Sequence, residues 1–160
     1  MRDHGFTLIE VLIAIGVMGI LMAIATHNWH EMQVKSAVES EIKKIHADLT
    51  EVRLQALYTK TARSVILSDQ QIKIYSSTDT SVDPIVTKQL RYPVKWNGGG
   101  PLTFNSQGVT SNLGSICVVP TNDLAVLNSA AEDSIVVSWT RLNLGKRTGG
   151  VCDSDHIDQK

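Results

Sequence analysis

The chain has 160 residues, 42% of them hydrophobic and 19% charged, and a formal net charge of −1. This length allows one modest globular domain besides an apolar segment, and it excludes a large enzyme. A net charge so close to zero excludes a global field that would attract nucleic acid or an acidic substrate, so any such function must be local.

A long apolar stretch lies close to the N-terminus. Residues 6–25 have the sequence "FTLIEVLIAIGVMGILMAIA", which is long enough to cross a bilayer as a helix. The stretch contains one acid, Glu10, and an ionised group in the hydrocarbon costs at least about 2.5 kcal/mol. No Lys or Arg occurs between Arg2 and Lys35. Unless Glu10 is protonated, its partner must therefore come from outside this segment.

Three interpretations of the stretch are open at this point. A secretory signal peptide would have the small-residue sequence "AIA" at Ala23–Ala25 as its cleavage site, although a Glu is unusual in its apolar core. A plain membrane anchor would let Glu10 reach the headgroups from the first turn of the span. Alternatively, cleavage between Gly5 and Phe6 would create an α-amine only four residues before Glu10.

The residues around this acid carry a specific resemblance to a known family. Residues 5–11, "GFTLIEV", resemble the class III signal of type IV pilins and pseudopilins. The resemblance implies that a prepilin peptidase removes a leader, residues 1–5, by cutting between Gly5 and Phe6, and that it N-methylates Phe6. It also implies that Glu10 pairs with the terminal amine of an adjacent subunit during filament assembly, so that the charge in the membrane has a purpose.

The resemblance further implies where the chain resides and what it contacts. The precursor would be a single-pass protein of the bacterial inner membrane, in contact with the lipid bilayer, with its head in the periplasm. Prepilin peptidase and an inner-membrane assembly platform would act on it. The processed protein would then join other major or minor pilins or pseudopilins in a filament.

Beyond the apolar stretch, hydrophobic residues recur at spacings of four and three, as on one face of a helix. They are Val34, Val38, Ile42, Ile45, Leu49, Val52 and Ala56. Neither Pro nor Gly interrupts residues 20–60. The sequence therefore predicts one long helix, with a transmembrane half at residues 6–25 and an amphipathic half at residues 26–60. The alternative is two helices joined near Asn28.

After residue 60 the pattern changes to short β-type runs, which predict a β-rich head at residues 61–160. Residues 63–77, "RSVILSDQQIKIYSS", predict a hairpin with its turn at residues 68–71. A strand interrupted by Pro93 follows, and then the runs "LTFNSQG", "SICVVP" and "DSIVVSWT". The predicted fold class is α+β, with the apolar stripe of the long helix packed on a mainly antiparallel β-sheet.

The head has a second resemblance, to the GspH/FimT family of minor pilins and pseudopilins. Phe104 and Gly108 match the F-x-x-x-G element of that family, and Gly145, Lys146 and Arg147 approximate its terminal basic Gly-Arg motif. The resemblance implies a minor type IV pilin or type II secretion pseudopilin, low in copy and placed near the filament tip.

Three cations, Arg141, Lys146 and Arg147, lie close together in the segment "TRLNLGKRTGG". They could contact phosphates of DNA, or they could form a solvated hairpin rim. FimT-like relatives bind DNA through a Gly-Arg-x-Arg motif, which implies DNA uptake in natural transformation as an alternative function. Here Lys146 replaces the first Arg of that motif. Trp139 is the one nearby aromatic, and strand alternation suggests a core position for it.

The two cysteines, Cys117 and Cys152, both follow the predicted span. A translocated chain would meet an oxidising compartment, where they could form a disulfide; two unpaired buried thiols are the alternative.

No catalytic or nucleotide-binding motif is present, so we expect neither an enzyme nor a cofactor. We expect no metal site, because His27 and His30 have no third ligand nearby. The acidic residues Asp153, Asp155 and Asp158 lack calcium-loop spacing, and a solvated tail is predicted for them.

Overall fold

The computed structural model describes residues 7–159. The chain divides into two compact units, Met1–Val34 and Lys35–Lys160. The predicted leader and the predicted cleavage site between Gly5 and Phe6 lie outside the described residues.

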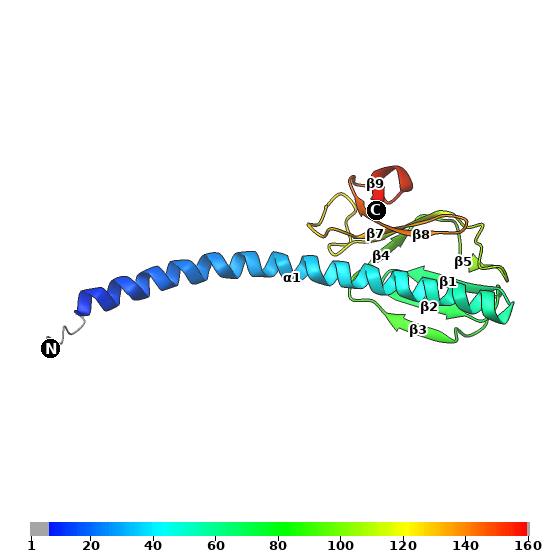
Figure 1. Ribbon diagram of the computed structural model, residues 1–160, viewed down its shortest axis with the longest axis horizontal. Helices are drawn as coiled ribbons and strands as arrows, with labels where there is room; N and C mark the ends of the chain where they lie inside the picture. Colours follow the sequence, from blue (N-terminus) through cyan, green and yellow to red (C-terminus); the bar gives the residue numbers. More distant parts are fainter. Residues whose placement is uncertain (1–6, 160) are drawn as a thin grey trace. The chain divides into compact units, whose positions relative to one another are not determined.

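One helix, α1, extends from Leu8 to Thr59 (Figure 1). The prediction of a single helix ending near residue 60 is confirmed. The helix ends where Lys60 adopts a positive φ of 55°, in the left-handed conformation that commonly follows the last helical turn.

The part of α1 in the first unit is apolar and exposed. Large side chains from Leu8 to Ile24 are between about half and four fifths exposed, for example 78% at Leu8 and 60% at Ile24. Among the described residues this is the helix that is long and apolar enough to cross a membrane, and none of its most apolar stretch is buried within the protein. A helix of a soluble core would bury such residues, so this surface needs an apolar environment from outside the chain.

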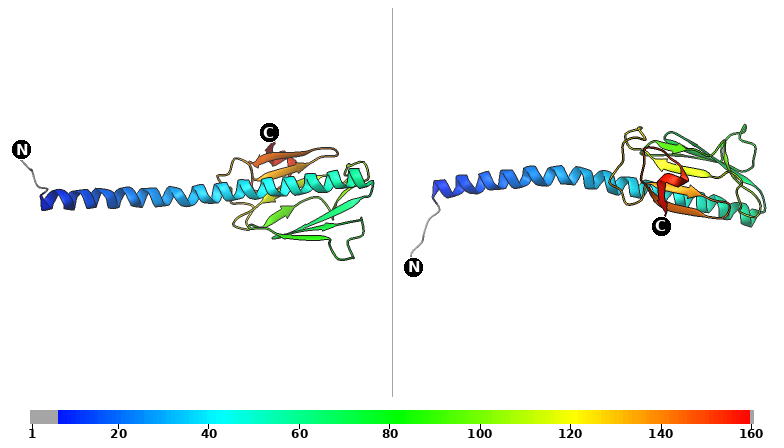
Figure 2. Two further views of the ribbon diagram at one scale, coloured as in Figure 1. Left: turned by 60° about the horizontal axis from the view of Figure 1, so that its bottom comes forward. Right: turned by 90° about the horizontal axis from the view of Figure 1, so that it is seen from above.

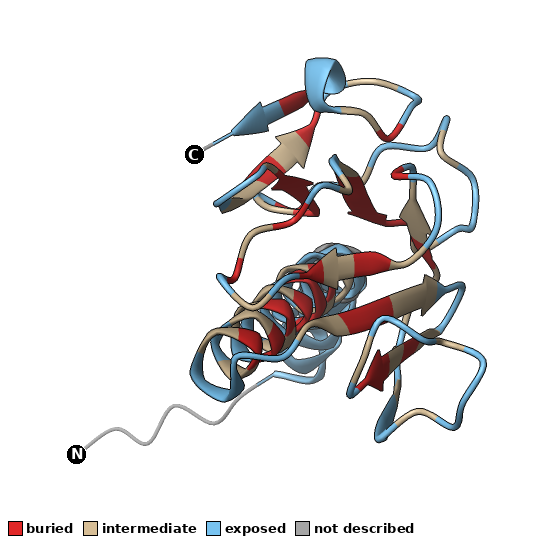
Figure 3. Cartoon of the chain, turned by 90° about the vertical axis from the view of Figure 1, so that its right-hand side faces the viewer, coloured by how far each residue is buried: buried red, intermediate tan, exposed pale blue. Residues whose placement is uncertain are grey.

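In the second unit, α1 buries the predicted apolar stripe. Its fully or almost fully buried positions are Val38, Ile42, Ile45, Leu49, Val52 and Ala56. The spacing of three and four residues keeps these side chains on one face, and that face is covered by strands (Figure 3).

The head contains two antiparallel sheets rather than one. The four-stranded sheet has the order β3-β2-β1-β5, with β1 at Arg63–Ser68, β2 at Gln71–Tyr75, β3 at Val86–Gln89 and β5 at Leu102–Phe104. The five-stranded sheet has the order β4-β6-β7-β8-β9, with β4 at Val94–Trp96, β6 at Gly114–Val118, β7 at Ser134–Val137, β8 at Leu142–Arg147 and β9 at Ile157–Gln159. The two sheets lie along different sides of the second half of α1 (Figure 2).

The predicted hairpin is β1–β2, and the pairing of Ser68 with Gln71 places its turn where the sequence indicated. The predicted strand around Pro93 is divided instead, because β3 and β4 on either side of it belong to different sheets. Proline has no backbone N–H to donate to a strand ladder, so Pro93 suits the point where the chain passes from one sheet to the other. The α+β class with mainly antiparallel strands is confirmed.

One prediction for the head is only partly right, and another is wrong. Asp155 and Asp158 are exposed, as a solvated tail predicts, but the segment is not a free tail, since a 3-10 turn, η1 at Ser154–His156, leads into β9, which pairs with β8. Trp139 is not in the core but 59% exposed, because β7 ends at Val137 and alternation no longer applies in the turn that follows.

Candidate assembly and binding sites

At the start of α1, Thr7 and Glu10 satisfy each other's polar groups. The carboxylate Oε2 of Glu10 accepts from the backbone N–H of Thr7 at 3.1 Å and from its Oγ1 at 3.0 Å. In return, the backbone N–H of Glu10 donates to Oγ1 of Thr7 at 3.3 Å. This is the reciprocal capping box of a helix N-terminus, in which two N–H groups without helical partners are satisfied.

The capping box was missed from the sequence, although its signal is there. The order Thr7, Leu8, Ile9, Glu10 is the S/T-x-x-E pattern immediately before an apolar run. The positive end of the helix dipole also favours an acid in this first turn. Glu10 therefore has a neutral partner in its own chain, and the contacts described for it include no cation.

In the head, acids on α1 hold loops from both sheets. Glu41 is 5% exposed and accepts from the backbone N–H of Arg91 at 2.8 Å, between β3 and β4. Glu39 accepts from the backbone N–H of Ala131 at 2.7 Å, in the connection between β6 and β7. These bonds fasten both sheets to the helix near the beginning of the head, where the second unit starts.

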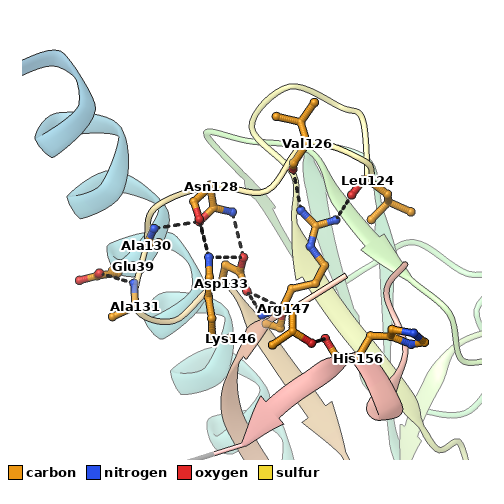
Figure 4. A network of polar contacts seen from close by, with 12 residues as sticks. Glu39, Leu124, Val126, Asn128, Ala130, Ala131, Asp133, Lys146, Arg147 and His156 are labelled. Atoms are coloured by element: carbon orange, nitrogen blue, oxygen red, sulfur yellow. Dashed lines mark hydrogen bonds and ion pairs between the residues drawn. The ribbon is translucent and has the colours of Figure 1, made fainter. Parts of the chain in front are cut away.

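Arg147, predicted as a DNA-binding cation, is buried in the head. The residue is 1% exposed, and its guanidinium donates to the carbonyl of Leu124 at 2.8 Å and to that of Val126 at 3.0 Å (Figure 4). Both carbonyls belong to the connection between β6 and β7. The guanidinium thus holds a long loop in place and does not face solvent.

Lys146 is also engaged within the head. Its ammonium lies 3.2 Å from Oδ2 of the fully buried Asp133 and donates to the carbonyl oxygen of Asn128 (Figure 4). The other carboxylate oxygen, Oδ1 of Asp133, accepts from the backbone N–H of Arg147 at 2.8 Å and from Oγ of Ser134 at 2.8 Å. A buried carboxylate needs such a set of donors to offset its loss of hydration.

Both alternatives for these three cations, contact with phosphates and a solvated hairpin rim, place them at the surface, which is wrong for Arg147 and only partly right for Lys146. The Lys146 side chain is 26% exposed and already ion-paired. Arg141 is exposed, since it lies in the turn before β8. No sequence pattern indicated that Asp133 would pair with Lys146 or that a loop would cover Arg147.

The two cysteines form a disulfide, with an S–S distance of 2.06 Å. Cys117 is in β6 and Cys152 follows β8, so the bond joins an inner strand of the five-stranded sheet to the C-terminal segment. The alternative of two unpaired thiols is wrong.

Among residues 7–159, no group of three or more His, Cys, Asp or Glu side chains is arranged to hold a metal ion. The placement of the His27 side chain is not among those described. At the C-terminus, Asp153 Oδ1 instead contacts Nδ1 of His156 at 2.6 Å. This bond holds the pKa of Asp153 below its usual value, against a small opposing effect of desolvation.

Residues 1–26 match the family model of the prokaryotic N-terminal methylation motif. This match supports the type IV pilin superfamily and indicates a pilin-like protein that is processed at its N-terminus. The matched residues comprise the segment before α1, the Thr7–Glu10 capping box and the exposed apolar helix. No curated protein and no solved structure matches the chain. The GspH/FimT resemblance of the head stays a prediction.

Proposed function

We propose that this chain is a minor type IV pilin or type II secretion pseudopilin of the GspH/FimT type. A prepilin peptidase cuts between Gly5 and Phe6 and methylates the new N-terminus, and the processed subunit is assembled near the tip of a filament. The protein is thus a structural subunit and not an enzyme.

The observation that carries this proposal is the combination at the start of α1. The methylation motif coincides with an exposed apolar helix whose one acid lies in its first turn, where Thr7 holds the carboxylate of Glu10 in place. A signal peptide or a plain anchor requires the apolar residues but has no need of a charged acid among them. A filament subunit requires both, because its helix leaves the bilayer and must select its position among neighbouring helices.

The proposed partner of Glu10 is the terminal amine of an adjacent subunit. Within an apolar surrounding, a carboxylate and an ammonium attract far more strongly than in water, and each is costly when unpaired. The hydroxyl of Thr7 is only a neutral donor, and a charge-assisted bond to an amine is roughly twice as strong. Glu10 would exchange one partner for the other when the subunit joins the filament.

The head supplies the outward-facing part of the proposed subunit. Its β strands are fixed to α1 through the buried stripe and through the bonds of Glu39 and Glu41 to loop amides. We place the head in the periplasm before assembly, with the apolar part of α1 in the bacterial inner membrane. The disulfide supports this placement, since such bonds persist in oxidising compartments.

Crosslinking in a host that assembles such filaments tests the proposal. The full chain is produced with a prepilin peptidase, filaments are sheared from the cells or extracted from the envelope, and crosslinked partners are identified by mass spectrometry. We expect pilins or pseudopilins of one machine as the main partners. A processed chain that stays alone in the membrane would exclude the filament function.

A further inference from the structure

The five-stranded sheet has a small apolar cluster of its own, apart from the buried stripe of α1. The cluster consists of Cys117, Val119, Val136, Cys152 and Ile157, with Leu124 packed against it. Two segments beyond β6, β7 and β8 contribute to it: residues 119–127 in the connection between β6 and β7, here called the loop segment, and residues 149–159, which include β9, here called the tail segment. The disulfide lies inside the cluster, so both segments pack around the same covalent bond.

Arg147 connects the same two segments through polar contacts. Its guanidinium donates to the carbonyls of Leu124 and Val126 in the loop segment. Its backbone is paired with Ile157 in the tail segment, in the register of β8 and β9. The guanidinium loses its hydration when the loop segment closes over it, and the two carbonyls replace the lost water at its two terminal nitrogens, whereas Nε is buried without a hydrogen-bond partner among the described residues.

Without the disulfide the tail segment is held weakly. β9 has three residues, of which Ile157 is buried and the other two are exposed. One further backbone bond, from Thr148 N–H to the carbonyl of His156 at 2.8 Å, precedes the strand. An edge strand this short provides few ladder bonds and little apolar burial to offset the entropy of ordering it.

We propose that the loop and tail segments form one cooperative unit, and that the Cys117–Cys152 bond is the redox-sensitive latch that keeps it closed. When the bond is intact, Cys152 holds the tail segment on β6, the tail completes the cluster under Leu124, and Arg147 holds the loop segment. When the bond is reduced, both segments open together. α1 and the four-stranded sheet keep their structure, because none of the cluster residues lies in them and because the bond from the Ala131 N–H to Glu39 lies outside the loop segment.

The switching chemistry is ordinary thiol–disulfide exchange with a dithiol. One thiolate of the reductant attacks a sulfur of the Cys117–Cys152 bond and forms a mixed disulfide, which releases one protein thiol. The second thiol of the reductant then displaces the other cysteine and closes a cyclic disulfide. Two electrons pass from the dithiol to the protein, and the two thiol protons move with them.

Opening of the unit would uncover the outer edge of β8, which β9 now covers. The exposed edge would present unpaired backbone groups, including the N–H of Thr148 that now donates to His156. In the reduced head, β8 thereby replaces the three-residue β9 as the edge strand of the sheet, beside Lys146.

Hydrogen exchange on the full chain in detergent micelles tests the proposal, and it needs no variant. The oxidised protein is compared with protein that has been reduced by a dithiol and alkylated. We expect exchange to become about tenfold faster or more in peptides from both segments, with residues 38–56 of α1 unchanged. Faster exchange in the tail segment alone would refute the cooperative unit, and faster exchange throughout the head would refute a local latch.

Since coupling between two sites is reciprocal, loosening the loop must also expose the disulfide. Arg147→Met removes the two donors to the loop carbonyls, and Arg141→Met is the matched control because that arginine is exposed. We expect the dithiol to reduce the bond several-fold faster in Arg147→Met than in Arg141→Met, with both proteins oxidised and folded at the start. Equal rates would refute the link through Arg147.

The inference goes beyond the proposed filament function and does not depend on it. Exchange and reduction rates are measured on the isolated chain, whereas the filament function is decided by crosslinked partners. A failure of the redox latch and a failure of the filament function can therefore be told apart.

Discussion

The carboxylate of Glu10 lies 3.0 Å from Oγ1 of Thr7, so the one acid within the apolar residues 6–25 has a partner before any other subunit arrives. Glu10 therefore has two roles that can be tested separately. One is to cap its own helix, and the other, which we propose, is to receive an amine from a neighbour. Substitutions at the two positions distinguish them.

Thr7→Val removes the cap but keeps the acid. Loss of an N-cap costs about 0.5–2 kcal/mol, so we expect slight fraying of the first turn and near-normal incorporation into filaments. Glu10→Gln keeps a cap acceptor but removes the charge, and incorporation should fall at least about tenfold while membrane insertion stays normal. Glu31→Gln, at an exposed acid of the same helix, is the control. Quantitative immunoblots of sheared filaments measure the effect, and equal incorporation of Glu10→Gln and parent would contradict the amine pairing.

Processing should leave a chain that begins at Phe6 and carries one methyl group on its α-amine. Intact-mass measurement of protein extracted from membranes checks this, with cells lacking the prepilin peptidase as the control. A mature chain beginning at Met1 would identify a plain anchor, and one beginning at Thr26 would identify a signal peptide.

Asp133→Ala should strongly destabilise the head. The buried carboxylate accepts from the backbone N–H of Arg147 and from Ser134, Asn128 and Lys146. Its removal leaves buried donors without a partner and a cation without its counter-ion, which costs about 3–5 kcal/mol. Thermal or denaturant unfolding of the oxidised protein measures the loss. Asp123→Ala is the control, because that residue is exposed and should change stability by less than about 1 kcal/mol.

The turn before β9 should loosen in acid. The His156 ring holds the pKa of Asp153 below its usual value, with a smaller contribution from the His156 backbone N–H. Because the folded pKa is lowered, the stabilisation is complete above the unfolded pKa of about 3.9 and is lost as pH falls through the folded value. NMR titration should show the His156 amide shifting below about pH 4. Asp153→Asn should abolish that shift and Asp155→Asn should leave it.

DNA binding by the head, if present, should be weak. Of the three predicted cations, Arg147 is buried and Lys146 is ion-paired, so Arg141 remains exposed. One phosphate contact corresponds to a slope of log K against log salt of about −1. Titration of a short duplex with the parent and with Arg141→Gln checks this, and Lys44→Gln provides a control at another exposed cation. A slope near −3 would mean that all three cations reach the DNA.

Local patterns in the sequence predicted the helix and the first hairpin correctly. The recurrence at spacings of three and four from Val38 to Ala56 places the recurring side chains on one helix face whatever packs against it, and the structure buries that face. The turn between Ser68 and Gln71 was predicted from its polar residues and from the alternation of apolar and polar residues beside it. Such features depend on neighbours a few residues apart, so no tertiary information is needed.

Short-range patterns do not determine the surroundings of the basic segment, residues 140–150. Alternation along β8 predicts only that Lys146 and Arg147 face opposite sides of the sheet. The carbonyls that receive the Arg147 guanidinium are 21 and 23 residues earlier in the chain. A charge at that position therefore suggested a surface, while the loop that covers it made it part of the interior.

By itself, the sequence determined the apolar helix with an acid near its start, the amphipathic continuation and a β-rich head with two cysteines in it, because these follow from composition and short periodicity. Only the tertiary structure decided that the strands form two sheets, that the tail segment adds β9, and that Arg147 is buried beneath the loop segment. The physical reason is that a short strand or a single charged side chain has no fixed environment of its own. Its burial depends on distant segments, whose docking is favourable only when the whole head has assembled.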